Sequence, residues 1–225
     1  MLLIIAVVCL SPGALIRWKI EQTVAGKVVG MLGTARSYSV SVSGGLFEIL
    51  RGRVKQVDIR GNDVKLSSGV VVDRLDVNLS GVEFKPDQTL TGVESTAFTA
   101  FLSEGNMDDY LRASRSDLSD ADVSLTDGKL SLTARPRVMA IRTPVRVEGT
   151  MRIVQGTKLY LVLNRLSARG IRVPGMIRGH IQHDLNPVLD TQQMAMGAKL
   201  TQVAITNGKI TLSGTADVRQ ALAAK

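Results

Sequence analysis

A twelve-residue pattern that occurs twice is the feature that most limits how this chain can fold. The stretch VAITNGKITLSG covers Val203–Gly214, the stretch VSLTDGKLSLTA covers Val123–Ala134, and five of their twelve positions are identical. In each copy, apolar and polar residues alternate on both sides of an Asn-Gly or Asp-Gly pair, which favours a two-residue turn between antiparallel strands. The sequence therefore predicts two similar β-hairpins, eighty residues apart.

The same alternation predicts which side chains of the hairpins share a face. Successive side chains of a strand point to opposite sides, so one set is expected to face the protein interior. This set comprises Val123, Leu125, Leu130, Leu132, Val203, Ile205, Ile210 and Leu212. We expect each hairpin to close over the amphipathic helix that precedes it.

Three amphipathic helices are predicted from apolar residues at helical spacing. They cover Ile20–Leu32, Thr96–Ala113 and Pro174–Leu185, and the second has an expected break at Gly105-Asn106. The first helix could pack on a sheet or lie in a membrane interface.

Other segments alternate as strands do, among them SYSVSVS and RLDVNLSGVEF, which places Leu75, Val77 and Leu79 on one face. The order of elements predicts an α+β fold with a single domain over residues 20–225. In this fold a long, curved antiparallel sheet wraps around amphipathic helices.

Composition favours strands and a core without large aromatic groups. Of the 225 residues, 44% are apolar but only 4% are aromatic, so Val, Leu and Ile must form the core. The only cysteine is Cys9, which excludes an internal disulfide and a zinc site made of cysteines.

The segment 1–19 is a candidate membrane anchor or signal segment. It is almost wholly apolar from Leu2 to Ile16 and then reaches Arg17 and Lys19. As a helix, the first sixteen residues would extend about 24 Å, less than a hydrocarbon core of about 30 Å. An uncleaved anchor, a cleaved signal peptide and a buried core helix all stay open. By the positive-inside rule, the two basic residues alone favour a cytoplasmic domain.

Positive charge is concentrated in residues 135–178. This segment carries ten Arg and Lys residues and a single acidic residue, Glu148, whereas the net charge of the whole chain is +8. A solvated strand face, a surface for anionic lipid headgroups and a nucleic-acid site are the alternatives. The scarcity of aromatic residues for base stacking disfavours nucleic acid.

The sequence contains no recognisable catalytic motif. His180 and His183 could share a helix face, but no further His or Cys is present to complete a metal site. There is no G-x-S-x-G nucleophile elbow, no P-loop and no dinucleotide-binding fingerprint after a strand. We therefore expect no catalytic residues, no metal and no cofactor.

Several stretches together resemble the LmeA-like phospholipid-binding family. LNPVLDTQQMAMGAKLTQVAITNGKITLSG is similar to the family's C-terminal signature, and GGLFEILRGRVKQVDIRGNDV is similar to its N-terminal part. TAFTAFLSEGNMDDYL lies where the family has its central helix, although QQMAMG departs from the Leu-Pro pair that relatives often have after the Asp. The resemblance implies a tubular lipid-binding fold, an extracytoplasmic membrane-associated location and no established catalytic residues.

These observations lead to an expected function of membrane-anchored phospholipid binding or lipid transfer in the cell envelope or periplasm, without catalysis. An aliphatic seam is expected to take the acyl chains, and its residues are Phe98, Phe101, Leu102, Ile177, Ile181, Leu185 and Val188. Arg169, Arg172 and Arg178 are expected to contact the phosphate headgroup. Phospholipid and the membrane are the expected partners. A structural envelope protein with a fully packed core is the alternative, and nucleic-acid binding is the third possibility.

Overall fold

The structure is a computed structural model of the whole chain. It describes residues 32–45, 48–49, 51–66, 69–85, 90–114, 120–135, 137–138, 141–142, 144–175, 179, 182–183, 186–193 and 197–217. The predicted segment 1–19, nearly all of the predicted helix 20–32 and most of the predicted helix 174–185 lie outside the described residues.

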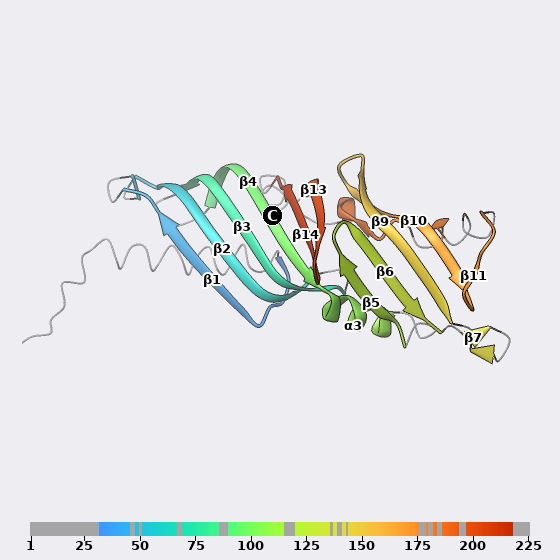
Figure 1. Cartoon of the computed structure of the whole chain (residues 1–225). Helices are drawn as coiled ribbons and strands as arrows, with labels where there is room; N and C mark the ends of the chain where they lie inside the picture. Colours follow the sequence, from blue (N-terminus) through green and yellow to red (C-terminus); the bar gives the residue numbers. More distant parts are fainter. Residues whose placement is uncertain are drawn as a thin grey trace, which may run out of the picture.

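Most of the described chain forms two open antiparallel sheets (Figure 1). The first sheet has the order β1 (Ser37–Ser43), β2 (Arg53–Lys65), β3 (Val71–Phe84), β4 (Leu90–Ser103), β14 (Lys209–Thr215) and β13 (Lys199–Thr206). The second sheet has the order β11 (Ile171–Arg172), β10 (Lys158–Ala168), β9 (Val145–Val154), β6 (Lys129–Ala134) and β5 (Asp122–Thr126). The antiparallel sheet is thus confirmed, whereas the tubular shape stays a prediction.

Short elements complete the described fold. Strand β12 (Leu189–Asp190) pairs with the start of β10, and β7 (Arg137–Val138) pairs with β8 (Ile141–Arg142). The helix α3 (Glu104–Ser114) lies at one end of the strands, and a 3₁₀ turn, η2, covers Thr191–Gln193.

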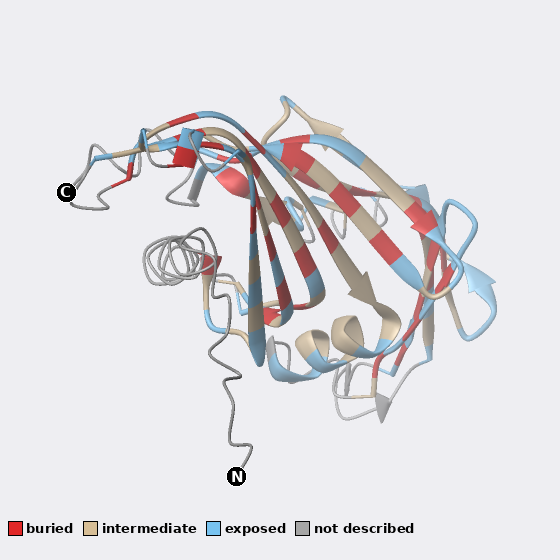
Figure 2. Ribbon diagram, turned by 90° about the vertical axis from the view of Figure 1, so that its left-hand side faces the viewer, coloured by how far each residue is buried: buried red, intermediate tan, exposed pale blue. Residues whose placement is uncertain are grey.

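Apolar side chains collect on one face of both sheets. Along β2 and β3, Val57, Ile59, Leu75, Val77 and Leu79 are buried, and their strand neighbours are more accessible. Figure 2 shows this alternation on strands that arch over one side of the molecule. In the two copied hairpins, seven of the eight side chains predicted to face inward are buried, and Val203 is partly buried against the same core. The predicted inner face is therefore confirmed.

The two copied hairpins contact each other at equivalent positions. The Gly128 N–H donates to the Ile205 carbonyl, and the Gly208 N–H donates to the Leu125 carbonyl, both at 2.9 Å. Because these pairs are related by the eighty-residue offset, the hairpins meet about an approximate local twofold axis, as identical subunits do in a symmetric dimer. This reciprocal pair joins the open edges of the two sheets, so the hairpins do not simply each cover a preceding helix.

The predicted helix over Thr96–Ala113 is wrong in its first half. Residues 90–103 form β4, which pairs with β3 and β14, and only Glu104–Ser114 is helical. A strand between two others explains the burial pattern better than a helix does, because every second side chain points to the interior. These side chains are Thr96, Phe98, Ala100 and Leu102. The helix begins after Ser103, whose hydroxyl caps the Asn106 N–H at 3.5 Å, so Gly105-Asn106 lies in the first turn.

Carboxylates of α3 protect the open edge of β5. The Val123 N–H donates to Asp108 at 2.8 Å, and the Leu125 N–H donates to Glu104. Burial raises the pKa of the Asp108 carboxyl above its ordinary value, while the Val123 N–H and the Arg112 guanidinium lower it in part. Satisfied edge groups cannot pair with a second chain, which is the usual hazard of an open sheet.

The equivalence of the two turns predicts matched effects of substitution. Gly128 and Gly208 have φ angles of +74° and +78°, and a Cβ at either position would meet no atom within 4 Å. Alanine is strained at these angles, so Gly128→Ala and Gly208→Ala should each lower the free energy of unfolding by about 1–2 kcal/mol in urea titrations. Gly105→Ala in α3, where a Cβ also meets open space, is the control and should not destabilise. Clearly unequal losses at the two turns would contradict the symmetric arrangement.

Candidate functional site

A large cavity lies beneath the arch of the strands. Its volume is about 640 Å³, within the range of about 300–1,000 Å³ that is typical of small-molecule sites. One wall comes from the inner face of β3, β4 and β14, and another from β9, β10 and β12. Met107 and Tyr110 of α3 line one end, and Thr191 and Ala198 lie beyond β12. The cavity is therefore built by both sheets and depends on their junction.

The wall of this cavity is almost entirely aliphatic. From the first sheet it includes Val72, Leu75, Val77, Ala100, Ile210 and Leu212. Lys65, which is exposed, is the one charged residue among the described lining residues. The polar Thr191 is buried, and its hydroxyl is within hydrogen-bond distance of the Thr157 and Ala198 carbonyls. The wall therefore offers an apolar ligand extensive contact and few polar groups.

The wall of the cavity has an energetic consequence. The cavity is partly open to solvent, so its aliphatic walls would be in contact with water if it were empty. Covering apolar surface contributes about 25 cal/mol per Å², so a guest that covers these walls is stabilised. Water would find few hydrogen-bonding partners on these walls. An apolar guest is the occupant that suits this space best.

The structure brings some of the predicted seam residues to the cavity. Phe98 and Leu102 line it from β4, and Val188 lines it from the segment before β12. Phe101 lies on the opposite face of β4, where the Arg74 guanidinium is 4.3 Å from the centre of its ring. Because Phe98 and Phe101 point to opposite sides of a strand, Phe101 does not line this cavity, and its contact with an acyl chain stays a prediction. Ile177, Ile181 and Leu185 lie outside the described residues.

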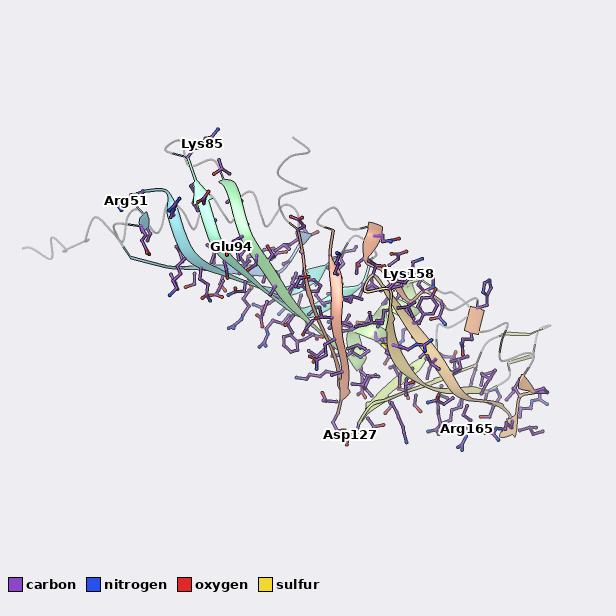
Figure 3. All side chains as sticks on the ribbon, turned by 90° about the horizontal axis from the view of Figure 1, so that it is seen from above. Arg51, Lys85, Glu94, Asp127, Lys158 and Arg165 are labelled. Carbon is purple, nitrogen blue, oxygen red and sulfur yellow. The ribbon has the colours of Figure 1, made fainter. Side chains whose placement is uncertain are left out.

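Arg169 and Arg172 do not line the cavity. Arg169 follows the end of β10, ten residues beyond Leu159, which lines the cavity. At about 3.3 Å per residue, this separates them by roughly 33 Å along the strand. In Figure 3, the labelled Lys158 and Arg165 of β10 lie well apart along the strand. Arg172 lies on β11 beside the end of β10, and Arg178 lies outside the described residues.

Several lining residues were not predicted as site residues. The alternation of β3 placed Leu75 and Val77 on one face, but it could not show that this face borders a cavity. Met107 and Met151 come from α3 and β9, and only the tertiary arrangement brings them together. Methionine adapts its shape readily and suits the wall of a site that accepts flexible ligands.

The segment NPVLDT, residues 186–191, shapes one end of the cavity. The Asn186 side chain pairs with the backbone of Leu161, accepting from its N–H at 2.7 Å and donating to its carbonyl at 2.9 Å. The Val188 N–H donates to the Leu159 carbonyl at 2.9 Å. These bonds attach the segment to the open edge of β10 and so position Val188, Leu189 and Thr191 along the cavity.

Within the described part of the chain, no group of three His, Cys, Asp or Glu side chains could hold a metal ion. In the same residues, no helix has both the length and the apolar character needed to cross a bilayer.

The cavity lies between two antiparallel sheets, and its aliphatic walls suit an apolar ligand. The chain belongs to the LmeA-like phospholipid-binding family, whose model matches residues 13–215. No curated protein and no solved structure is significantly similar to the chain. Family membership and the character of the cavity together support lipid binding.

Proposed function

We propose that this protein is a membrane-associated phospholipid carrier or sensor whose cavity holds acyl chains, and that it performs no catalysis. The observation that carries the proposal is the aliphatic cavity of about 640 Å³ in a member of a phospholipid-binding family. A fully packed structural protein is disfavoured, because the described residues leave an aliphatic cavity between the two sheets.

The walls supply enough apolar contact to hold a lipid. Each buried methylene group contributes about 0.8 kcal/mol, so half of an ordinary acyl chain, about eight carbons, contributes roughly 6 kcal/mol. Lys65 at the edge of the cavity is a cation that can meet the phosphate of such a lipid. In this proposal Lys65, and not Arg169 or Arg172, meets the headgroup of the lipid that the cavity holds. A cavity that is open to solvent also suits lipid transfer. Transfer is measured as the exchange of a fluorescent lipid between vesicles.

Filling the cavity should remove the lipid without unfolding the protein. Ala100 lines the cavity between Leu75 of β3 and Leu212 of β14, and Ala97 on the same strand is exposed. Ala100→Phe should occupy acyl-chain space, so phospholipid in an organic extract of the purified protein should fall severalfold by mass spectrometry. The melting temperature should stay close to that of the wild type, because the ring enters open space.

Ala97→Phe makes the same change on the other face of β4 and should retain the lipid. A wild-type protein that carries no phospholipid would contradict the proposal. So would an Ala100→Phe variant that is destabilised by about 1–3 kcal/mol, the usual result of overpacking a filled core.

We further propose that the domain lies outside the cytoplasm and is tethered by segment 1–19. The support is the apolar run from Leu2 to Ile16 and the location that the family resemblance implies. Full-length protein should sediment with membranes, and protease added to intact spheroplasts should digest it. A cytosolic control protein must survive the same treatment. Full protection of this protein until the cells are lysed would place the domain in the cytoplasm.

A further inference from the structure

A rigid hairpin forms the far end of the second sheet. We call residues 169–172 the tip: Arg169 and Gly170 make the turn between β10 and β11, and Ile171 and Arg172 form β11. Ala168 pairs with Ile171, and Ser167 pairs with Arg172. The Arg169 N–H donates to the Pro144 carbonyl at 2.9 Å, and the Val173 N–H donates to the Leu166 carbonyl at 2.9 Å. The tip is therefore held on both sides by backbone hydrogen bonds.

Ile171 is unusually exposed for a large aliphatic residue. Its exposed fraction is 74%, and the other exposed large hydrophobic residue in the described part of the chain is Val188, at 37%, beside the cavity. A single exposed aliphatic residue is common on protein surfaces and indicates nothing by itself. At the tip, however, the two flanking side chains Arg169 and Arg172 are both exposed arginines.

The charge around the tip is strongly positive. Arg146 on β9 and Arg165 on β10 share one carboxylate, Glu148, at 3.2 and 3.7 Å. Among the described residues, Arg169 and Arg172 have no ion-pair partner. Within the described strands, the next acidic residue in this row of paired strands is Asp122 on β5. The residues that pair in turn across the sheet from β5 to β11 are Asp122, Thr133, Arg146, Ser167 and Arg172. The strand β5 is therefore four strand spacings from β11. Four spacings are about 19 Å, beyond a Debye length of about 8–10 Å in ordinary salt.

The backbone of Arg169 has a positive φ angle, as do those of Asp63 and Gln155. The φ angle of Arg169 is +52°, followed by +78° at Gly170, the combination of a type I′ turn. Asn, Asp and Gly adopt the first position of this turn at lower cost than arginine does. Conformational strain of this kind is found preferentially at functional sites. The turn therefore presents a cation where a neutral residue would fold more easily.

We propose that the tip is a docking site for an anionic lipid bilayer. Arg169 and Arg172 bind lipid phosphates, and Ile171 between them enters the boundary between headgroups and acyl chains. Aliphatic contact combined with arginines matches an anionic membrane surface better than it matches nucleic acid, because the tip has no aromatic side chain for base stacking. The site is distinct from the cavity, which begins about ten residues away along β10, and it does not require that the cavity hold lipid.

A probe at position 171 tests the docking directly in the full-length chain. Cys9→Ser removes the native thiol, after which Ile171→Cys or Asp127→Cys is labelled with an environment-sensitive fluorophore. Asp127 lies in the β5–β6 turn at the other end of the second sheet and is the matched control. With vesicles of phosphatidylcholine and phosphatidylglycerol, the emission at position 171 should shift to the blue and rise severalfold. The emission at position 127 should not change.

Charge variants complete the test. The double substitution Arg169→Gln and Arg172→Gln should raise the lipid concentration needed for half of the response at position 171 about thirtyfold. Each basic residue at such a surface contributes about 1 kcal/mol. Arg51→Gln with Arg53→Gln, on exposed residues at the opposite end of the molecule (Figure 3), should leave the response unchanged. Circular dichroism should show the same fold for both.

Several outcomes would overturn the docking proposal. In one, the protein floats with the vesicles but the emission of the probe at position 171 does not shift. Another segment would then bind the protein to the vesicles. Equal responses to neutral and anionic vesicles would remove the role of the arginines. A response to duplex DNA but not to vesicles would identify the wrong partner. Loss of lipid from the cavity in the filled variant bears on the proposed function alone, so the two proposals can fail separately.

Discussion

The reciprocal contact between the two copied hairpins is the interaction on which the rest of this structure depends. Each sheet is open, and each ends at the junction in an edge strand, β13 or β5. The exchanged bonds of Gly128 with Ile205 and of Gly208 with Leu125 bring these edges together. Together with the bond from the Leu200 N–H to the Gly156 carbonyl at 2.6 Å, which joins β13 to the β9–β10 turn, they let the inner faces of the two sheets border a common space. The repetition in the sequence thus has a structural reason, because two like hairpins can pack about a local twofold axis and join two unlike sheets.

An excess of aliphatic surface follows from this arrangement. Each strand presents Val, Leu or Ile to the inside, and the described helix α3 covers one end of the sheets. The remaining face encloses a cavity that few polar groups line. A chain with only 4% aromatic residues has few side chains large enough to fill such a space. Lipid binding is therefore a consequence of how the core is built and requires no reactive side chain.

The sequence predicted the local structure well and the long-range arrangement poorly. Alternation identified both hairpins and the inward set that includes Leu125 and Ile210, because a strand's periodicity is a local property. The run TAFTAFLS was assigned to a helix, because its apolar residues fit either period and only pairing with β3 and β14 selects the strand. Phe98 and Leu102 were therefore predicted as site residues for an incorrect reason. The arginines lay close to the seam in sequence, but a straight strand carries Arg169 far from Leu159.

Photo-crosslinking of a bound phospholipid tests the central claim that the cavity holds acyl chains. A phospholipid with a diazirine near the end of one acyl chain would be loaded into the full-length protein, irradiated and located by peptide mass spectrometry. The account predicts that the label falls on peptides that contain cavity residues from both sheets and α3, such as Leu75, Met107 and Met151. Label that is confined to segment 1–19 or to the tip, with none on these peptides, would show that the acyl chain lies outside the cavity and would contradict the account.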